Sequence, residues 1–336
     1  MGHPAAGEYG RRLATDRTTP AMPDSPLLAV IVDTEEEFDW SRPFSRDALA
    51  VQSIAAQPGM HTVFRRWGIV PTYVVDWPVA TTPEASAVLR RLLEAGECEI
   101  GTHLHPWVNP PYDEELSPRN SFAGNLPREL ERRKLTALTE AITAAFGTAP
   151  KVYKAGRYGF GANTAGLLAG LGYEIDASMV PHTSFAADEG PDFRGCCDRP
   201  HWRGELFELP LSVGFVGRLA ERGPVLYPLL ADVRWRRARL PGIAARCGLI
   251  ERLRLTPEGF SLADLRRLTR AMLARGHRVF SFCYHSPSLA VGHTPYVQNE
   301  RDLGTFMATC EGYFRFFAEE LGGRFTTPTA IRAALS

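Results

Sequence analysis

The sequence of 336 residues lacks several features that would set the class of protein. No apolar run approaches the roughly 18 residues that a transmembrane helix needs. The six cysteines show no C-x-x-C spacing, so neither a zinc ribbon nor a dithiol redox motif is indicated. Basic and acidic residues balance at 38 each, so the sequence gives no indication of a nucleic-acid partner.

Lysine is scarce, since only Lys134, Lys151 and Lys154 stand among the 38 basic residues. Residues 1–26 mix glycine, proline, alanine, threonine and charged side chains without periodicity, so we expect a disordered N-terminal segment there. That segment lacks the apolar core of a signal peptide. Because the cysteine spacing does not suggest a disulfide framework either, the sequence favours a protein of the reducing cytoplasm.

Short apolar runs alternate with amphipathic helical stretches about seven times, which is typical of a parallel sheet with helical connections. Polar side chains follow several of the predicted strands at their carboxyl ends. An α/β barrel has its active site at that end, whereas an open sheet would gather its site at one crossover point. We therefore predict a distorted, TIM-like (β/α)7 barrel, as a single domain over residues 27–330.

Residues from about 218 to 258 interrupt this alternation. Nine arginines between Arg218 and Arg254 are interleaved with leucine, tryptophan and isoleucine, so we predict an insertion in the barrel. One interpretation is a pair of amphipathic helices with a solvated basic face. The other is a surface that meets a phosphate or a membrane face.

Two histidines stand two residues apart in the predicted strand that stops at Pro106. Side chains alternate along a strand, so His103 and His105 point to the same side. Neutral imidazoles in this arrangement can bind one divalent cation. A pair of partly buried structural histidines is the alternative.

An acidic segment follows the apolar run 27–32, with five carboxylates within residues 33–39. The alternation of the strand puts Asp33 and Glu35 on one face. Like charges at the end of a buried strand repel, and a bound cation relieves the repulsion. A solvated acidic loop, or acidic residues at a helix N-terminus, would explain the same pattern.

Three later strand ends also carry polar residues. The fourth predicted strand ends at Arg157, and glycine alternates with aromatic residues in Tyr158–Gly161, so backbone N–H groups there could approach a ligand. Asp176 and Ser178 share one face of a later strand, although an aspartate at a strand end often caps the next turn. The last clear strand ends at His285, where a structural histidine is the alternative to a catalytic one.

In order along the chain come an acidic strand end, His-x-His, an arginine, Asp-x-Ser and a late histidine. This order resembles the polysaccharide deacetylase family, also called the NodB-homology or carbohydrate esterase 4 domain. The resemblance covers about residues 27–325 and is nearest to the WalW-like branch, which is associated with bacterial surface-polysaccharide genes. It implies a divalent metal, with zinc first and cobalt, nickel or manganese as alternatives.

The family's first two motifs imply a catalytic aspartate and a set of metal ligands. Asp33 matches the catalytic aspartate, and Glu35 stands in for the metal-binding neighbour, because Thr34 occupies the usual position. His103 and His105 match the two metal-binding histidines, which the family normally spaces four residues apart.

The remaining motifs imply further roles. Arg157 matches the arginine that orients the catalytic aspartate, although the family's Pro-Tyr sequel is replaced here. Asp176 and Ser178 match the fourth motif, and His285 matches the general acid.

The chemistry implied is hydrolysis of an amide or ester. Asp33 would take the proton of a water activated by the metal, and His285 would protonate the leaving amine. The backbone N–H of Tyr158 would donate to the oxyanion. The rings of Trp40, Trp107 and Tyr158 could stack on a sugar, although packing explains each of them too.

We therefore predict a metal-dependent deacetylase that acts on an N-acetylated sugar in surface-polysaccharide or lipopolysaccharide biosynthesis. In the cytoplasm its carbohydrate substrate would be nucleotide- or lipid-linked, and the Arg-rich insertion could make a peripheral membrane contact. Two other hypotheses stay open. One is a hydrolase of another carbon–nitrogen bond, for example in a cyclic amide, and the other is a catalytically silent carbohydrate-binding protein.

Overall fold

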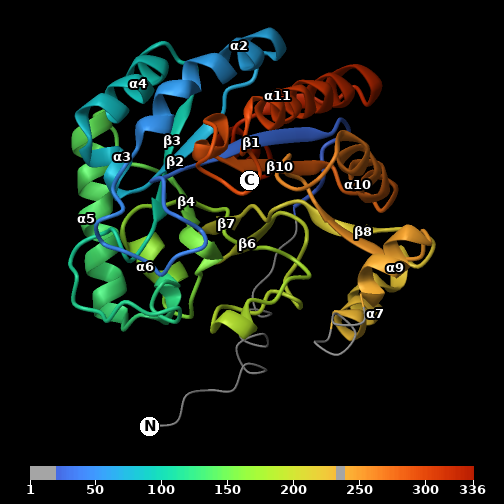
Figure 1. The fold of residues 1–336 in the computed structure, drawn as a ribbon, viewed down its shortest axis with the longest axis horizontal. Coiled ribbons are helices and arrows are strands. Elements are labelled where there is room, and N and C mark those ends of the chain that lie inside the picture. The colour runs from blue at the N-terminus through green and yellow to red at the C-terminus, as the bar shows by residue number, and fades with distance from the viewer. Residues whose placement is uncertain (1–19, 232–238) are drawn as a thin grey trace.

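The fold is organised around a nine-stranded sheet with the strand order β10-β1-β2-β3-β4-β5-β7-β6, in which β11 also pairs with β1. The structure is a computed structural model that describes residues 20–231 and 239–336. Within these residues the strand pairs of this sheet are parallel, except the antiparallel pair of β6 and β7. Figure 1 shows the strands at the centre of the molecule and the helices around them.

The strands of the sheet are β1 (Leu27–Thr34), β2 (Thr72–Val75), β3 (Glu99–Leu104), β4 (Val152–Ala155), β5 (Ile175–Asp176), β6 (His201–Arg203), β7 (Leu206–Glu208), β10 (Val279–His285) and β11 (Arg324–Thr326). The helices that surround it are α2 (Gln57–Trp67), α3 (Trp77–Thr81), α4 (Pro83–Glu94), α5 (Arg128–Phe146), α6 (Thr164–Gly170), α10 (Leu262–Ala274), α11 (Glu300–Arg315) and α12 (Pro328–Ala334).

Backbone hydrogen bonds between segments outside these strands extend the curled sheet toward β10. The N–H of Leu211 donates to the Met179 carbonyl oxygen at 2.9 Å, and the N–H of Leu255 donates to the Ser212 carbonyl oxygen at 2.9 Å. The N–H of Cys283 in β10 donates to the Leu255 carbonyl oxygen at 3.2 Å. This mixed α/β fold with a curled parallel sheet confirms the predicted distorted (β/α)7 architecture.

Side chains on each strand alternate between two apolar cores. In β1, Leu28 and Val30 pack in the core beneath the helices, whereas Ala29 and Ile31 pack in a second core inside the curled sheet. A strand buried on both faces has this continuous apolar sequence. Asp33 is the next residue of the interior series, so its side chain emerges above the inner core.

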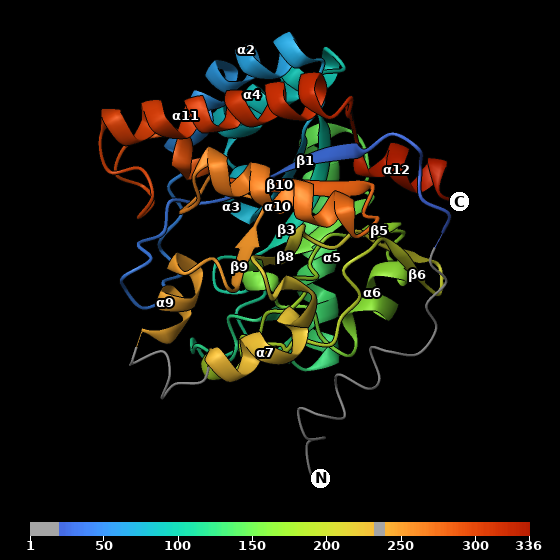
Figure 2. The same ribbon diagram turned by 90° about the vertical axis from the view of Figure 1, so that its right-hand side faces the viewer.

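The α12 helix closes the interior at the amino-terminal ends of the strands. Ile331 and Leu335 of this segment join the inner core with Leu27 and Val279, the first residues of β1 and β10. Figure 2 shows α12 on the side of the molecule away from α9. A cavity of about 490 Å³ lies at the other end of the strands.

In the described part of the predicted Arg-rich insertion, the structure has two helices and one strand of a separate ribbon. These are α7 (Gly223–Leu230), α9 (Leu240–Arg246) and β9 (Glu251–Arg254), which pairs antiparallel with β8 (Val213–Val216). Residues 232–238 of the insertion lie outside the described part of the chain. The expected helix pair is present, but Arg252 and Arg254 belong to β9 and not to a solvated helix face.

The limits proposed for the N-terminal segment and the barrel stay predictions, since residues 1–19 of the segment 1–26 are not among the described residues. In the part that the structure describes, no helix combines the length and apolar character needed to cross a bilayer.

A buried lysine on α5 holds the long loop that follows β3. The Nζ of Lys134 donates to the carbonyl oxygens of Pro106 at 2.9 Å and Asn109 at 2.5 Å, and it forms an ion pair with Glu114 at 3.0 Å. The Lys134 side chain is fully buried, and that of Glu114 is 4% exposed. These contacts fix the loop directly after the two histidines of β3.

We expect Lys134→Met to lower the free energy of unfolding by about 3–5 kcal/mol, because it leaves a buried carboxylate without its partner. Urea unfolding would measure the change. Arg133→Met is the matched control, since the neighbouring Arg133 forms an exposed ion pair with Asp113 and should cost less than about 1 kcal/mol. Equal stability of the two variants would show that the Lys134 contacts do not hold the loop.

Candidate active site

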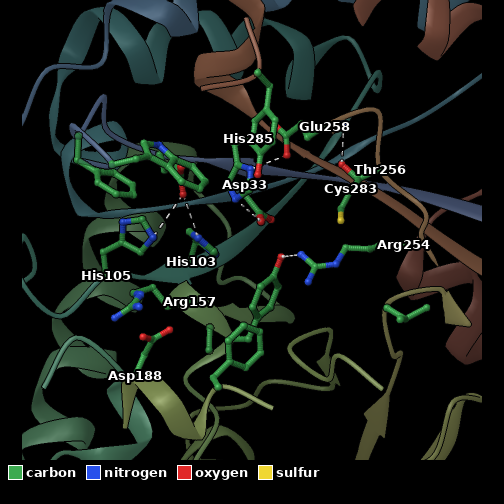
Figure 3. Close-up of a pocket in the computed structure, with 18 of the residues that line it drawn as sticks. Asp33, His103, His105, Arg157, Asp188, Arg254, Thr256, Glu258, Cys283 and His285 are labelled. Atoms are coloured by element: carbon green, nitrogen blue, oxygen red, sulfur yellow. Dashed lines mark hydrogen bonds and ion pairs between the residues drawn. The ribbon is translucent and has the colours of Figure 1, made fainter. Parts of the chain in front are cut away.

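A cavity of about 490 Å³ lies at the carboxyl ends of the strands, and Figure 3 shows the side chains around it. Most of the predicted site residues line it, namely Trp40, Asp33, Glu35, His103, His105, Arg157, Tyr158 and His285. Trp107 and Asp176 do not.

Strand register explains why residues far apart in sequence meet here. In the parallel pair of β1 and β10, Asp33 lies opposite His285, and in the pair of β3 and β4, His103 lies opposite Lys154. Residues that are opposite each other in a parallel pair point to the same face of the sheet. The interior faces of β1, β3, β4 and β10 therefore bring these four side chains together.

Glu35, His103 and His105 form a group that could hold a metal ion. The Oε2 of Glu35 lies 3.4 Å from the Nε2 of His103 and 3.4 Å from the Nε2 of His105, and all three side chains are buried. Figure 3 shows His103 and His105 side by side at the cavity. The structure thus brings these three residues together, and their role as metal ligands stays a prediction.

The donor atoms of this group fit a divalent ion. Two donors each about 2.1 Å from a tetrahedral ion lie roughly 3.4 Å apart, which is the separation of the Glu35 oxygen from each histidine nitrogen. The other oxygen of Glu35 is buried and has no hydrogen-bond partner among the described residues. A bound cation would satisfy this carboxylate.

Burial keeps the two imidazoles in the neutral form that binds metals. It lowers the pKa of His105 to about 4 and holds the pKa of His103 well below its usual value. Burial also raises the pKa of Glu35 well above its usual value, and the carboxylates of Glu36, Asp33 and Asp76 add to that shift. A cation would reverse the shift of Glu35 by favouring its charged form.

A second layer of contacts orients the two histidines. The Nδ1 of His103 lies 2.8 Å from the Lys154 carbonyl oxygen, and the Nδ1 of His105 lies 2.7 Å from Oε2 of Glu36. Trp107 stacks on the His105 ring at 4.2 Å between centroids and donates its indole N–H to Glu36. Because each Nδ1 is engaged, each Nε2 faces Glu35 with a free lone pair.

Gly156 gives the His105 ring its space. A Cβ added at Gly156 would lie 2.1 Å from Cδ2 of His105 and 2.6 Å from the Leu104 carbonyl oxygen. Neither approach is sterically allowed, so a side chain at this position would displace the histidine. The sequence after β4 is therefore adapted to the site even where it contributes no functional group.

Asp33 is held by a lysine and not by the predicted arginine. The Nζ of Lys154 donates to both oxygens of Asp33, at 2.5 and 2.6 Å. Burial alone would raise the pKa of Asp33, but Lys154, His103 and His285 outweigh it and lower that pKa below its usual value. The orienting role expected for Arg157 is therefore wrong in this structure, and Lys154 takes the place beside the aspartate.

Arg157 instead packs at the rim of the cavity. It follows β4 in a short 3-10 turn (Gly156–Tyr158), with φ of 51°, and its guanidinium lies 4.2 Å from the Phe122 ring centroid. It also donates to Ser121. The turn of the backbone after β4 carries its side chain past the strand, which leaves Lys154 as the residue that faces Asp33.

His285 is paired with a carboxylate that the sequence analysis missed. Its Nδ1 lies 2.7 Å from Oε2 of Glu258, and its Nε2 lies 3.7 Å from Oδ2 of Asp33. Glu258 also accepts from the His285 backbone N–H at 3.0 Å and from the Ser288 hydroxyl at 2.6 Å. Burial would lower the pKa of His285, but Glu258 outweighs it and raises that pKa.

Asp176 lies on the opposite face of the sheet from this site. Its neighbours Ile175 and Ala177 belong to the inner core, so the alternation of β5 directs Asp176 outward. There it accepts from the Ser178 hydroxyl at 2.5 Å and lies opposite Glu208 of β7. The catalytic role expected for Asp176 is therefore wrong, because the side chain does not reach the cavity.

The three aromatic residues expected to stack on a sugar lie in different surroundings. Trp40 is 39% exposed, and its ring meets His285 edge-on at 5.1 Å. The Tyr158 hydroxyl accepts from Arg254 at 3.1 Å. Trp107 is buried beneath His105, so it supports the histidine and cannot act as a stacking surface, which corrects its predicted role.

The sequence analysis missed Lys154 and Glu258, and the sequence indicates the role of only one of them. Lys154 is one of three lysines in the chain, and it stands inside a predicted apolar strand, where a charge needs a partner. Glu258 stands at the end of the predicted insertion and far from His285, so spacing alone gives no sign of their contact.

No protein-family model and no curated protein matches the sequence. Solved structures do match it. A structure from Mycobacterium smegmatis that is described as a polysaccharide deacetylase has a TM-score of 0.54 and 16% identity, covering 95% of this chain and 94% of that chain. The PuuE allantoinase has a TM-score of 0.54 and 14% identity, covering 99% and 97%.

At these identities the likeness defines the fold. The chain has the α/β fold of the polysaccharide deacetylase and allantoinase structures over nearly its whole length, which confirms the expected resemblance at that level. Membership of the WalW-like branch stays a prediction.

We expect Glu258→Gln to move the alkaline limb of the pH–activity profile to lower pH by roughly one unit. A general acid works only while protonated, and loss of the Glu258 charge lowers the pKa of His285. The profile of kcat against pH would measure the shift. Glu251→Gln, which removes a partner of Arg267 on the surface, is the control and should leave the profile in place.

Proposed function

We propose that the protein is a metal-dependent deacetylase that hydrolyses the acetamido group of an N-acetylated sugar. The observation that carries the proposal is the meeting of Glu35, His103 and His105 in the wall of a cavity shared with Asp33 and His285. The fold shared with a polysaccharide deacetylase supports it.

Glu35, His103 and His105 would hold a divalent ion, which would supply a Lewis acid for a carbonyl and would lower the pKa of a water. The Asp33 carboxylate, kept charged by Lys154, accepts the proton of the attacking water. His285, kept protonated by Glu258, donates a proton to the leaving nitrogen. The backbone N–H of Tyr158 provides a donor for the oxyanion.

The proposal also covers which metal ion is bound and in which biosynthesis the protein acts. Zinc is the first candidate because imidazole and carboxylate ligands suit it, with cobalt, nickel or manganese as alternatives. The setting proposed is surface-polysaccharide or lipopolysaccharide biosynthesis in the cytoplasm, on a nucleotide- or lipid-linked sugar.

Hydrolysis of a cyclic amide is the second candidate function. The allantoinase structure matches this chain with the same TM-score as the deacetylase structure and covers slightly more of it. A water activated at the same group of side chains could attack the carbonyl of a ring amide as readily as that of an acetamide. Assays with both kinds of substrate therefore separate the two activities.

We expect roughly one divalent ion per wild-type chain by mass spectrometry, and its loss in His103→Ala/His105→Ala. The same double variant should release acetate from N-acetylated sugars roughly 100-fold or more slowly. His293→Ala, a partly exposed histidine that contacts Glu37, is the control for both measurements.

The substrate panel decides between the candidate functions. Acetate release from free, oligomeric or nucleotide-linked N-acetyl sugars supports deacetylation, whereas ring opening of allantoin or related cyclic amides supports the second candidate. Saccharide binding that survives chelators and His285→Ala, without turnover or bound metal, would overturn both and favour a silent binding protein.

We further propose that the insertion makes a peripheral contact with an anionic membrane. Exposed apolar side chains gather on α7, α9 and the turn after α9, namely Val225 (71%), Leu229 (63%), Ile243 (48%) and Leu249 (38%). Arg222, Arg239 and Arg246 of the same segment are also exposed. Apolar side chains flanked by cationic ones suit the interface of an anionic bilayer. Figure 1 shows α7 and α9 at the periphery of the molecule.

We expect the protein to sediment with vesicles that contain anionic lipid at low salt and to leave them at high salt, because salt screens the arginines. Val225→Ser/Leu229→Ser should weaken binding several-fold by removing the inserted apolar groups. Leu49→Ser is the control, since Leu49 is 47% exposed elsewhere on the surface. Equal binding of neutral and anionic vesicles would refute an electrostatic contact.

A further inference from the structure

Two arginines of β9 line the cavity although they belong to the insertion. Arg252 and Arg254 stand two residues apart on one strand, so their side chains lie on the same face of the ribbon. Figure 3 shows Arg254 entering the cavity from the side opposite His105. The cavity thus has a cationic wall across from the proposed metal ligands.

The surrounding residues orient these guanidinium groups but do not neutralise them. Arg254 donates to the Tyr158 hydroxyl at 3.1 Å, and Arg252 donates to the His182 carbonyl oxygen at 2.7 Å and the Thr183 hydroxyl at 3.2 Å. Among the described residues no carboxylate lies within 4 Å of either group. Each arginine is partly buried, so it has given up some water without forming a direct ion pair, although Glu258 acts on Arg254 from a longer distance.

The carboxylates of the cavity are engaged elsewhere. Asp33 is paired with Lys154, Glu258 is paired with His285, and Glu35 faces the two histidines of β3. Asp188 also lines the cavity, but Figure 3 shows it beside Arg157. The wall formed by Arg252 and Arg254 therefore carries positive charge that the carboxylates of the cavity do not pair with directly.

We propose that Arg252 and Arg254 bind a phosphate ester carried by the substrate, while its acyl group reaches Glu35, His103 and His105. This inference rests on the proposed function and specifies its substrate as an anionic, phosphorylated sugar. Guanidinium groups present several donors in a fixed plane, which suits the oxygens of a phosphate. The hydrogen bonds to Tyr158 and to the 182–183 segment fix both groups before the ligand arrives.

The phosphate ester could come from a nucleotide-linked or a lipid-linked sugar, because both present the same oxygens to the two arginines. Binding of sugar phosphates without an acyl group tests the subsite apart from catalysis. The ligands are glucose, glucose 1-phosphate, UDP-glucose and glucosyl decyl phosphate, measured by calorimetry on wild type and variants.

We expect glucose 1-phosphate to bind at least tenfold more tightly than glucose, and Arg252→Gln/Arg254→Gln to remove the difference. Tighter binding of UDP-glucose or of glucosyl decyl phosphate would identify the nucleotide or the lipid source. Arg246→Gln is the matched control, because Arg246 is an exposed arginine of the same insertion and lies outside the cavity. Arg252→Lys/Arg254→Lys keeps the charge and should keep most of the preference even if the glutamine variant is unstable.

Catalysis gives the second readout. The glutamine variant should raise KM for N-acetylglucosamine 1-phosphate at least tenfold, with a smaller change in kcat and little change for N-acetylglucosamine. Phosphate-dependent binding without acetate release would support the subsite and remove only the deacetylase function. Equal binding of glucose and glucose 1-phosphate by wild type, or an unchanged preference in the glutamine variant, would overturn the subsite.

Discussion

The concentration of buried carboxylates at the carboxyl ends of β1 and β2 is the constraint on which the rest of the site depends. Asp33, Glu35, Glu36 and Asp76 are each no more than 2% exposed, and buried charges need partners. Each of these four carboxylates has different neighbours. Asp33 has Lys154, and Asp76 accepts from the backbone N–H groups of Glu36 and Val79.

The other two carboxylates organise the histidines. Glu36 accepts from Trp107 and faces His105, which fixes the outer nitrogen of that ring. Glu35 faces both inner nitrogens and keeps one oxygen without a partner in the described residues. A bound cation would give this carboxylate the partner that the described residues do not supply.

Much of the architecture follows from patterns in the sequence, because apolar strands alternate with amphipathic helices. The site was predictable where a strand continues its alternation to its end, as in β1, β3 and β10. This alternation places Asp33, His103 and His285 on the same, interior side of the sheet. It failed for Asp176, because β5 is only two residues long and the face it turns inward is set by its neighbours.

The choice between Lys154 and Arg157 also depended on three-dimensional detail. Lys154 lies in β4, and Arg157 comes shortly after the end of that strand. The backbone adopts a left-handed conformation at Arg157, which no motif in the sequence indicates. For a similar reason, the sequence does not indicate that residues of the insertion line the cavity. It arises from the pairing of β9 with β8, a contact between segments about forty residues apart.

The plug formed by α12 has a consequence for how molecules reach this site. Its side chains fill the barrel at the amino-terminal ends of the strands, and the cavity opens at the opposite end. A long glycan can therefore lie across the mouth but cannot thread through the barrel. Any ligand that reaches Glu35 therefore enters and leaves through the same opening at the carboxyl ends of the strands.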